Sequence, residues 1–499
     1  MFRVGGSSHE DDAIVRTTQT SSVVRRLAAQ GHLIGDEWRA SDSGGVYDHC
    51  NPATGQIQAC VGLAGAADVE DAVAAAREAQ EAWASRAPST RASVLFRLAQ
   101  LLDDHATEAA ELASLDNGTP VSIMNPGAYA ASWVRYYAGW CDKLDGEQLA
   151  GGRGYVRREP YGVIAAIPPW NGSMMGMGQK CGPALAAGNA VVAKPPEIAP
   201  FGMMRFGELA LEAGLPPGVL NIVTGGPETG AALVRHPGVG KISFTGGTAT
   251  GRRLMETAAQ NLTPLTLELG GKSPNIIFPD ADLDAAAQMA AFAGPALLSG
   301  QGCALPTRLY VHDDVYDQVV SKVVEVVKGL CVGDPLDPAT LVGPVVTEAA
   351  MERILGVIGR AEADGATLLE GGRRLGGELA GGWFIAPTVF GDVEHESDVA
   401  RYEVFGPVLA ILRFHSESEV LAKANDSDLG LSAYLHTSDR GRIDRFVRQL
   451  ESGTVVVNGM GRSTPAAPFG GTKRSGFGRE GGRAGIEEMV RCKTVFEST

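Results

Sequence analysis

The sequence predicts an α/β protein with parallel sheets, and three observations support this class. Short apolar runs that begin at residues 163, 190, 220 and 241 alternate with helix-length segments. This spacing is typical of β-α-β units, in which a crossover helix joins two parallel strands. Further apolar runs follow residue 270 and predict a second α/β unit. Polar and turn-forming residues follow the runs, so we expect binding groups at the carboxyl edge of the sheet.

The segments before residue 163 predict an arm, a strand with a turn, and two helices. We expect residues 1–30 to form a loose N-terminal arm and residues 32–38 to form the strand and turn. Asp68 can cap a first helix, and a second amphipathic helix is expected after Pro88. The expected apolar faces consist of Val69, Val73, Ala76 and Trp83, and of Leu95, Leu98, Leu102, Ala109 and Leu112.

The second half of the chain predicts strands over residues 275–278, 409–414 and 453–458. The turn at residues 280–282 is expected to open a helix. Because no fixed-period repeat or low-complexity linker separates the two α/β units, we expect them to pack closely together.

Composition narrows the class of protein. The chain has 499 residues, 44% of them hydrophobic, and a net charge of −15. No apolar run approaches the roughly 20 residues that span a bilayer, and the polar N-terminus does not resemble a signal peptide. The acidic balance argues against a nucleic-acid partner. We therefore expect a soluble cytoplasmic protein with neither a nucleic-acid nor a membrane partner.

Cysteine and histidine spacing argues against a disulfide framework or a metal site. The seven cysteines are scattered and form no CxxC pair, and the nine histidines form no HxxxH cluster. We expect reduced thiols, as in the cytoplasm, and no metal ligands.

Two clusters that follow predicted strands carry groups suited to binding. Asn171 could donate a hydrogen bond to a developing oxyanion, although Pro-Trp-Asn is most often a turn with a packed indole. Lys194 and Glu197 could hold a diol from two sides, and the alternative is a solvated loop with a surface pair.

Three further clusters suggest a phosphate site, a base and a nucleophile. The Gly-rich segment 244–251 could place backbone N–H groups near a pyrophosphate, with a helix starting at Arg252, or could be an ordinary turn. Glu268, between two leucines, suits a general base with a raised pKa, or pairs with a basic side chain. Cys303 lies beside Gly302 and could be an accessible nucleophile or an inert core residue.

In this order the clusters resemble the NAD(P)-dependent aldehyde dehydrogenase superfamily. Supporting motifs are Glu403–Val408, Gly453–Asn458, Pro468–Lys473 and Gly478–Glu480. The resemblance implies an aldehyde-dehydrogenase-like α/β fold with a Rossmann-type cofactor domain, an α/β catalytic domain and a small β oligomerisation element. The implied bounds are an arm at 1–30, an NAD-binding domain at 31–141 and 161–269, a catalytic domain at 270–485, and an oligomerisation element at 142–160 and 486–499.

The resemblance also assigns roles to residues. It implies Cys303 as nucleophile, Glu268 as general base, Asn171 as oxyanion donor, and Lys180 as a residue near that amide. The implied cofactor-binding residues are Ile167, Trp170, Lys194, Glu197, Gly225, Gly246, Gly247, Glu403 and Phe405, with Trp170 bordering the adenosine, and Glu403 and Phe405 at the nicotinamide end. The implied substrate pocket consists of Met175, Gln179, Gly302 and Phe469.

The implied function is NAD-dependent oxidation of an aldehyde to the carboxylic acid. Glu268 favours water over coenzyme A as acyl acceptor, and Glu197 favours NAD while leaving NADP use open. The alternatives are a coenzyme A-acylating semialdehyde dehydrogenase and a thiol esterase. A medium or bulky apolar aldehyde fits the pocket residues. Arg462 could pair with an acidic aldehyde, and the alternative is an ordinary solvated loop arginine. The resemblance further implies a homodimer or homotetramer.

Overall fold

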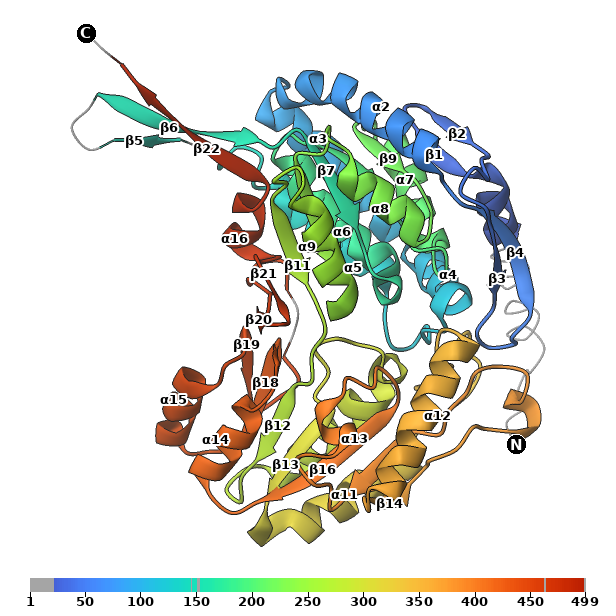
Figure 1. Ribbon diagram of the computed structural model, residues 1–499, viewed down its shortest axis with the longest axis vertical. Coiled ribbons are helices and arrows are strands. Elements are labelled where there is room, and N and C mark those ends of the chain that lie inside the picture. The colour runs from blue at the N-terminus through green and yellow to red at the C-terminus, as the bar shows by residue number, and fades with distance from the viewer. Residues whose placement is uncertain (1–21, 145, 150–152, 462–463, 498–499) are drawn as a thin grey trace, which may run out of the picture.

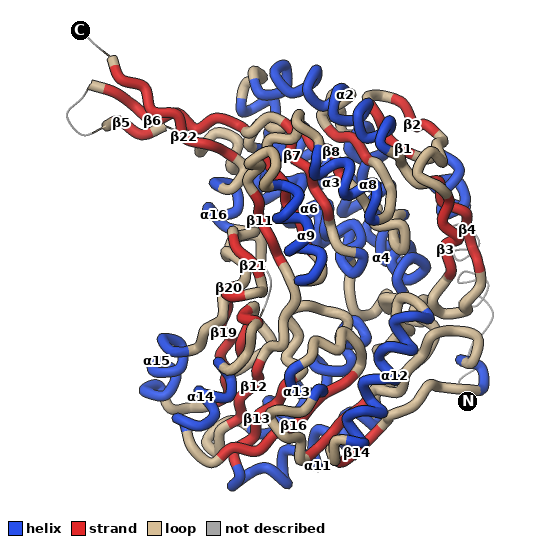
Figure 2. Tube along the Cα trace, viewed as in Figure 1, coloured by secondary structure: helices blue, strands red, loops and turns tan. Residues whose placement is uncertain are grey.

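The computed structural model describes residues 22–144, 146–149, 153–461 and 464–497. Two α/β lobes lie against each other, and a narrow β arm projects from one of them (Figure 1). Figure 2 shows that helices flank the strands of both lobes. Within the described residues, no helix has the length and apolarity needed to cross a membrane.

The first lobe contains an eight-stranded sheet in the order β2-β1-β9-β8-β7-β10-β11-β21. Its five central strands are parallel, whereas β1, β2 and β21 are antiparallel to their neighbours. The strands are β1 His32–Ile34, β2 Glu37–Arg39, β7 Val163–Ile167, β8 Ala190–Ala193, β9 Leu220–Ile222, β10 Lys241–Thr245, β11 Leu265–Glu268 and β21 Gly476–Phe477. The four apolar runs predicted as strands therefore match β7 to β10.

Both faces of this sheet are buried, because its strands alternate apolar side chains between two helical layers. In β7, Ile164 and Ala166 join one core, and Val163 and Ala165 join the other. The helices are α2 Ala66–Ala84, α3 Pro88–Asp104, α4 Ala106–Asn117, α5 Pro126–Ala138, α6 Ser173–Ala186, α7 Phe201–Glu212, α8 Pro227–Arg235 and α9 Thr248–Ala258. A small hairpin, β3 Val46–Cys50 and β4 Ile57–Gly62, lies outside this sheet.

The second lobe contains a seven-stranded sheet in the order β14-β15-β16-β13-β12-β18-β19, parallel except for β14. Its strands are β12 Pro274–Ile277, β13 Arg308–His312, β14 Thr367–Glu370, β15 Thr388–Gly391, β16 Val408–Phe414, β18 Ser432–His436 and β19 Thr454–Val457. Its helices are α10 Leu283–Ala291, α11 Tyr316–Lys328, α12 Glu348–Ala363, α13 Asp398–Arg401, α14 Glu417–Asn425 and α15 Arg440–Gln449. The predicted strands correspond to β12, β16 and β19.

The projecting arm is a three-stranded antiparallel sheet in the order β22-β6-β5 (Figure 1). It joins β5 Glu147–Gln148 and β6 Gly154–Pro160 to β22 Val490–Phe496, which follows α16 Gly482–Glu487. A short ladder of β17 Leu429–Gly430 with β20 Thr472–Lys473 lies near β21.

Several predicted boundaries are wrong, and each has a local cause. Asp68 is not the N-cap of α2, because Gly65 takes that position and donates its N–H to the Asp68 carboxylate. The helix expected after Pro88 is two helices, since His105 leaves helical geometry at φ −101° and ψ 19°. The helix after the Gly-rich segment starts at Thr248 rather than Arg252.

The N-terminal arm is only partly described. Residues 1–21 lie outside the described residues, whereas residues 22–30 form a helix. Val24 and Leu27 of this helix are buried in the core of the first lobe. The described part of the predicted arm is therefore packed rather than loose.

Candidate active site

The candidate site lies where the two sheets meet. Ile167 and Glu268 are the last residues of the parallel strands β7 and β11. The chain continues from Glu268 into β12, and Cys303 lies in the loop before β13. The carboxyl edge of the first sheet therefore faces the amino edge of the second across this site (Figure 1).

Cys303 is half-buried, on a turn between two short irregular helices and β13. Burial raises the pKa of its thiol to about 12, and the charges of Glu403 and Glu268 add to this effect. The thiol is thus protonated at neutral pH and needs a base to become a nucleophile. Glu403 and Glu268 are therefore within electrostatic range of the thiol.

Glu268 is a buried carboxyl group without a hydrogen-bond partner. It is 2% exposed, and neither carboxylate oxygen has a partner among the described residues. Burial raises its pKa well above the usual range, and the charge of Glu480 raises it further. The alternative of an ion pair with a basic side chain does not occur in the described chain, and the group is suited to accept a proton near neutral pH.

Lys180 and Glu480 form a buried ion pair beside Glu268. Lys180 Nζ lies 2.7 Å from Glu480 Oε1 and 3.2 Å from the hydroxyl of Ser243. The positive charge of Lys180 lowers the pKa of Glu268, whereas Glu480 raises it. Lys180 was among the residues predicted for the site. Glu480 was not, although it is the last residue of the motif Gly478–Glu480.

The side chain of Asn171 is fixed by the nucleophile loop. Its Nδ2 donates a hydrogen bond to the carbonyl of Gln301, two residues before Cys303, at 2.8 Å. An amide carries two N–H groups, so one remains for another acceptor. The contact joins the Asn171 turn of the first lobe to the Cys303 loop of the second.

The predicted ribose-binding residues gather at the ends of β8 and β9. Lys194 is 7% exposed, and its Nζ donates to the carbonyl of Gly225. Burial lowers the pKa of Lys194 to about 8, although the charge of Glu197 opposes this shift. A Cβ on Gly226 would lie 3.4 Å from Glu197 Oε1, so this carboxylate borders the start of α8.

The Gly-rich segment leaves room at the N-terminus of α9. Gly246 donates its N–H to the carbonyl of Glu268 at 3.0 Å, and a Cβ there would strike the Phe244 ring. Gly247 is the N-cap, and a Cβ on it would have nothing within 4 Å. A helix N-terminus with open space and free backbone donors is suited to a pyrophosphate.

Glu403 and Phe405 come from the second lobe. Glu403 Oε1 accepts the N–H of Gly271 at 2.9 Å, and burial raises the pKa of this carboxyl. The Phe405 ring packs edge-on against Trp170, with ring centroids 5.6 Å apart. Trp170 was predicted to border the adenosine. It instead contacts Phe405, the residue predicted to lie at the nicotinamide end.

The predicted substrate-pocket residues are half-buried. Met175 and Gln179 lie four residues apart on α6, and Gln179 precedes Lys180. Phe469 exchanges two backbone hydrogen bonds with Glu480. Gly302 has little room, since a Cβ there would lie 2.8 Å from Leu305. Arg462, considered for acidic substrates, lies outside the described residues.

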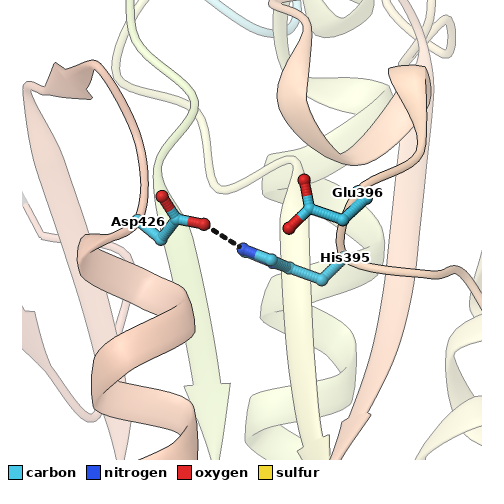
Figure 3. A group of neighbouring side chains, drawn as sticks. All are labelled: His395, Glu396 and Asp426. Carbon is cyan, nitrogen blue, oxygen red and sulfur yellow. Dashed lines mark hydrogen bonds and ion pairs between the residues drawn. The ribbon is translucent and has the colours of Figure 1, made fainter.

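Among the described residues, one group has metal-ligand chemistry, but its carboxylates already pair with a basic side chain. The candidate ligand atoms of His395, Glu396 and Asp426 lie within 4.8 Å of one another (Figure 3). His395 Nε2 contacts Asp426 at 3.0 Å, and Arg401 pairs with Asp426 at 2.9 Å and with Glu396 at 3.2 Å. Arg401 pairs with both carboxylates, so we assign no metal here.

Comparisons with known proteins agree with this architecture. The model of the aldehyde dehydrogenase family matches residues 38–495. The crystal structure of HpcC from Thermus thermophilus superposes with a TM-score of 0.93 at 37% identity, covering 97% of this chain and 95% of that chain. An NAD+ complex of a Bacillus cereus aldehyde dehydrogenase gives 0.90 at 38% identity, with 94% and 96% covered. An E. coli NADP-dependent enzyme gives 0.91 at 38% identity, with 94% and 98% covered.

The fold thus defines an enzyme class that uses NAD or NADP to oxidise aldehydes. The chain belongs to the aldehyde dehydrogenase family, as the resemblance of its motifs predicted. Its fold class, with a Rossmann-type cofactor lobe and an α/β catalytic lobe, is also confirmed.

Proposed function

We propose that this enzyme oxidises an aldehyde to the free carboxylic acid with NAD, through covalent intermediates on Cys303. One observation carries the proposal. Glu268, a buried carboxyl group with no hydrogen-bond partner among the described residues, raises the pKa of Cys303, and the loop of Cys303 binds the amide of Asn171. A base, a nucleophile and an oxyanion donor are what acyl chemistry on a cysteine requires.

The first step is attack of the Cys303 sulfur on the aldehyde carbon, with the thiol proton leaving to solvent water. The carbonyl electron pair moves to oxygen, and the free N–H of Asn171 and the backbone N–H of Cys303 stabilise that oxyanion. When bound, NAD would supply the hydride acceptor that conversion of the thiohemiacetal into a thioester on Cys303 requires. Glu268 then removes a proton from water, which attacks the thioester and releases the acid and the thiol.

The residues present fit a dinucleotide. The open N-terminus of α9 at Gly247 suits a pyrophosphate, and Lys194 with Glu197 would hold the adenosine ribose. Glu403 would hold the second ribose, since its carboxylate is already oriented by the N–H of Gly271.

NAD is the proposed cofactor because Glu197 would repel the 2′-phosphate of NADP. Replacing Glu197 with Ser should raise the NADP/NAD ratio of kcat/KM at least about tenfold. Glu212→Ser removes an exposed carboxylate at the end of α7 and should leave the ratio unchanged. An unchanged ratio in Glu197→Ser would contradict the assignment.

The proposed substrate is a medium or bulky apolar aldehyde, since Met175, four residues before Gln179 on α6, and Phe469 are half-buried apolar side chains. A panel of aliphatic, aromatic and acidic aldehydes, assayed by NADH absorbance, tests this class. A preference for acidic aldehydes would contradict it.

Two rivals keep the fold but change the reaction. Stimulation of NADH formation by coenzyme A would indicate an acylating enzyme, which the carboxyl group of Glu268 argues against. Ester cleavage without nicotinamide would indicate a thiol esterase. Cys303→Ser should abolish NADH formation while NAD still binds, and turnover in that variant would refute the proposal.

We also infer a homodimer or homotetramer, because β6 and β22 of the projecting arm form a sheet outside both lobes, and Phe496 is 75% exposed on it. All seven cysteines are free thiols, which supports the proposed cytoplasmic location. The proposed domain bounds are those predicted from the sequence. β21 lies within the catalytic segment of the chain but pairs with β11 of the first sheet.

A further inference from the structure

Asn117 is a buried residue with no role in the chemistry described above. It is the last residue of α4 and is 2% exposed. Its Nδ2 donates a hydrogen bond to the carbonyl of Trp170 at 3.0 Å. That carbonyl belongs to the peptide that joins Trp170 to Asn171, so the bond acts one peptide away from the proposed oxyanion donor.

The amide of Asn117 is itself held in one orientation. Its Oδ1 accepts the N–H of Thr119 at 3.1 Å and the hydroxyl of Thr119 at 2.7 Å. These two donors identify the oxygen, and the nitrogen must therefore face Trp170. Gly118, at φ +79°, turns the chain between Asn117 and Thr119, a conformation that favours glycine.

The same turn touches the segment that supports the nucleophile loop. A Cβ on Gly343 would lie 2.1 Å from the carbonyl oxygen of Gly118, so the two backbones are in direct contact. The carbonyl of Gly343 accepts the Ser299 hydroxyl at 2.9 Å, and Val346 donates its N–H to Gln301 Oε1 at 3.0 Å.

These contacts close a ring between the two lobes. From Asn117 the ring passes through Trp170 and Asn171 to Gln301, and it returns through residues 343–346 to Gly118. Asn171 and the loop of Cys303 are thus positioned by one set of contacts. Displacement of a reacting group by about 1 Å can cost about a hundredfold in rate.

We propose that Asn117 is a positioning residue that fixes the Trp170–Asn171 peptide and so aims the Asn171 amide at the oxyanion formed on Cys303. The inference rests on the proposed function of Asn171. Without Asn117, the Trp170 carbonyl loses its buried donor and the peptide is free to rotate. The expected loss is in kcat, because the amide acts after the substrate is bound.

A double-mutant cycle tests this role. Asn117→Ala should lower kcat about tenfold in the otherwise unchanged enzyme, and less than about twofold in an Asn171→Ala background, with KM for the aldehyde nearly constant. Thr119→Val is the matched control, because it removes a hydrogen bond of the same cluster but leaves the bond to Trp170. It should lower the melting temperature with little change in kcat.

The variants test the role of Asn171 and the role of Asn117 separately. If Asn171→Ala alone leaves kcat unchanged, the proposed function of Asn171 fails. If Asn171→Ala is impaired but Asn117→Ala lowers kcat equally in both backgrounds, the positioning role fails and Asn117 is merely structural. Asn117→Asp keeps the acceptor for Thr119 and loses the donor at neutral pH, so a folded Asn117→Asp variant with full kcat would also overturn the inference.

Discussion

Lys180 and Glu480 form an ion pair between α6 and the C-terminal segment, with Nζ and Oε1 2.7 Å apart and both side chains buried. The pair matters because its two charges act on Glu268 in opposite directions. Glu480 favours the protonated form of the general base, and Lys180 favours the ionised form. The pair therefore tunes the pH at which the proposed base works.

Replacing either partner should shift the acid limb of the pH–rate profile. Glu480→Gln removes the charge that raises the pKa of Glu268, so the limb should move to lower pH by about one unit. Lys180→Met removes the charge that lowers this pKa, so the limb should move to higher pH. Steady-state rates between pH 5 and 9 measure both shifts, and limbs that stay in place or move together would contradict this account.

The resting state of Cys303 gives a second prediction. Because its pKa is about 12, alkylation by iodoacetamide without cofactor should be slow at pH 7 and rise about tenfold per pH unit up to about pH 10. Cys303→Ala measures the background from the exposed thiols of Cys60, Cys331 and Cys492. A rate that reaches a plateau below about pH 9 would show a thiol with a lower pKa.

Gly270 and Gly271 lie in close contact with two residues of the candidate site, Glu403 and Cys303. A Cβ on Gly270 would lie 2.2 Å from Glu403 Oε2, and one on Gly271 would lie 2.2 Å from the carbonyl oxygen of Cys303. Gly270→Ala should therefore weaken NAD binding in calorimetric titration. Gly271→Ala should lower kcat more than about tenfold, because it moves the Cys303 backbone.

The control for these variants is Gly359→Ala, since a Cβ there has nothing within 4 Å on helix α12. It should bind NAD normally and gain stability of up to about 1 kcal/mol, because alanine favours the helix. If Gly270→Ala and Gly271→Ala behave like Gly359→Ala, the close contacts are not functional.

The secondary structure was predictable because its signals are local. The runs at 163–167 and 190–193 match β7 and β8, since a strand buried on both faces reads as a continuous apolar run. Asp282 caps α10 as its turn predicted, with its side chain accepting the N–H of Ala285. The helix break at His105 was missed because the apolar period continues across it.

The polar contacts of the site were not predictable, because they join residues that are distant in the chain. Glu480 is 300 positions from Lys180, and Gln301 is 130 positions from Asn171. The types of these residues fit many roles, and only the folded structure pairs them. The candidate nucleophile, base and amide could be named from motifs, whereas the groups that orient them could not.

The central claim is that an acyl group passes through Cys303 and leaves by a water that Glu268 activates. Glu268→Gln keeps the size of the side chain and removes the base. After mixing with aldehyde and NAD, this variant should release about one NADH per subunit and then stall, and intact-mass spectrometry should find one acyl group on Cys303. Steady turnover at the unmodified enzyme's rate, with no acyl group on Cys303, would contradict the claim.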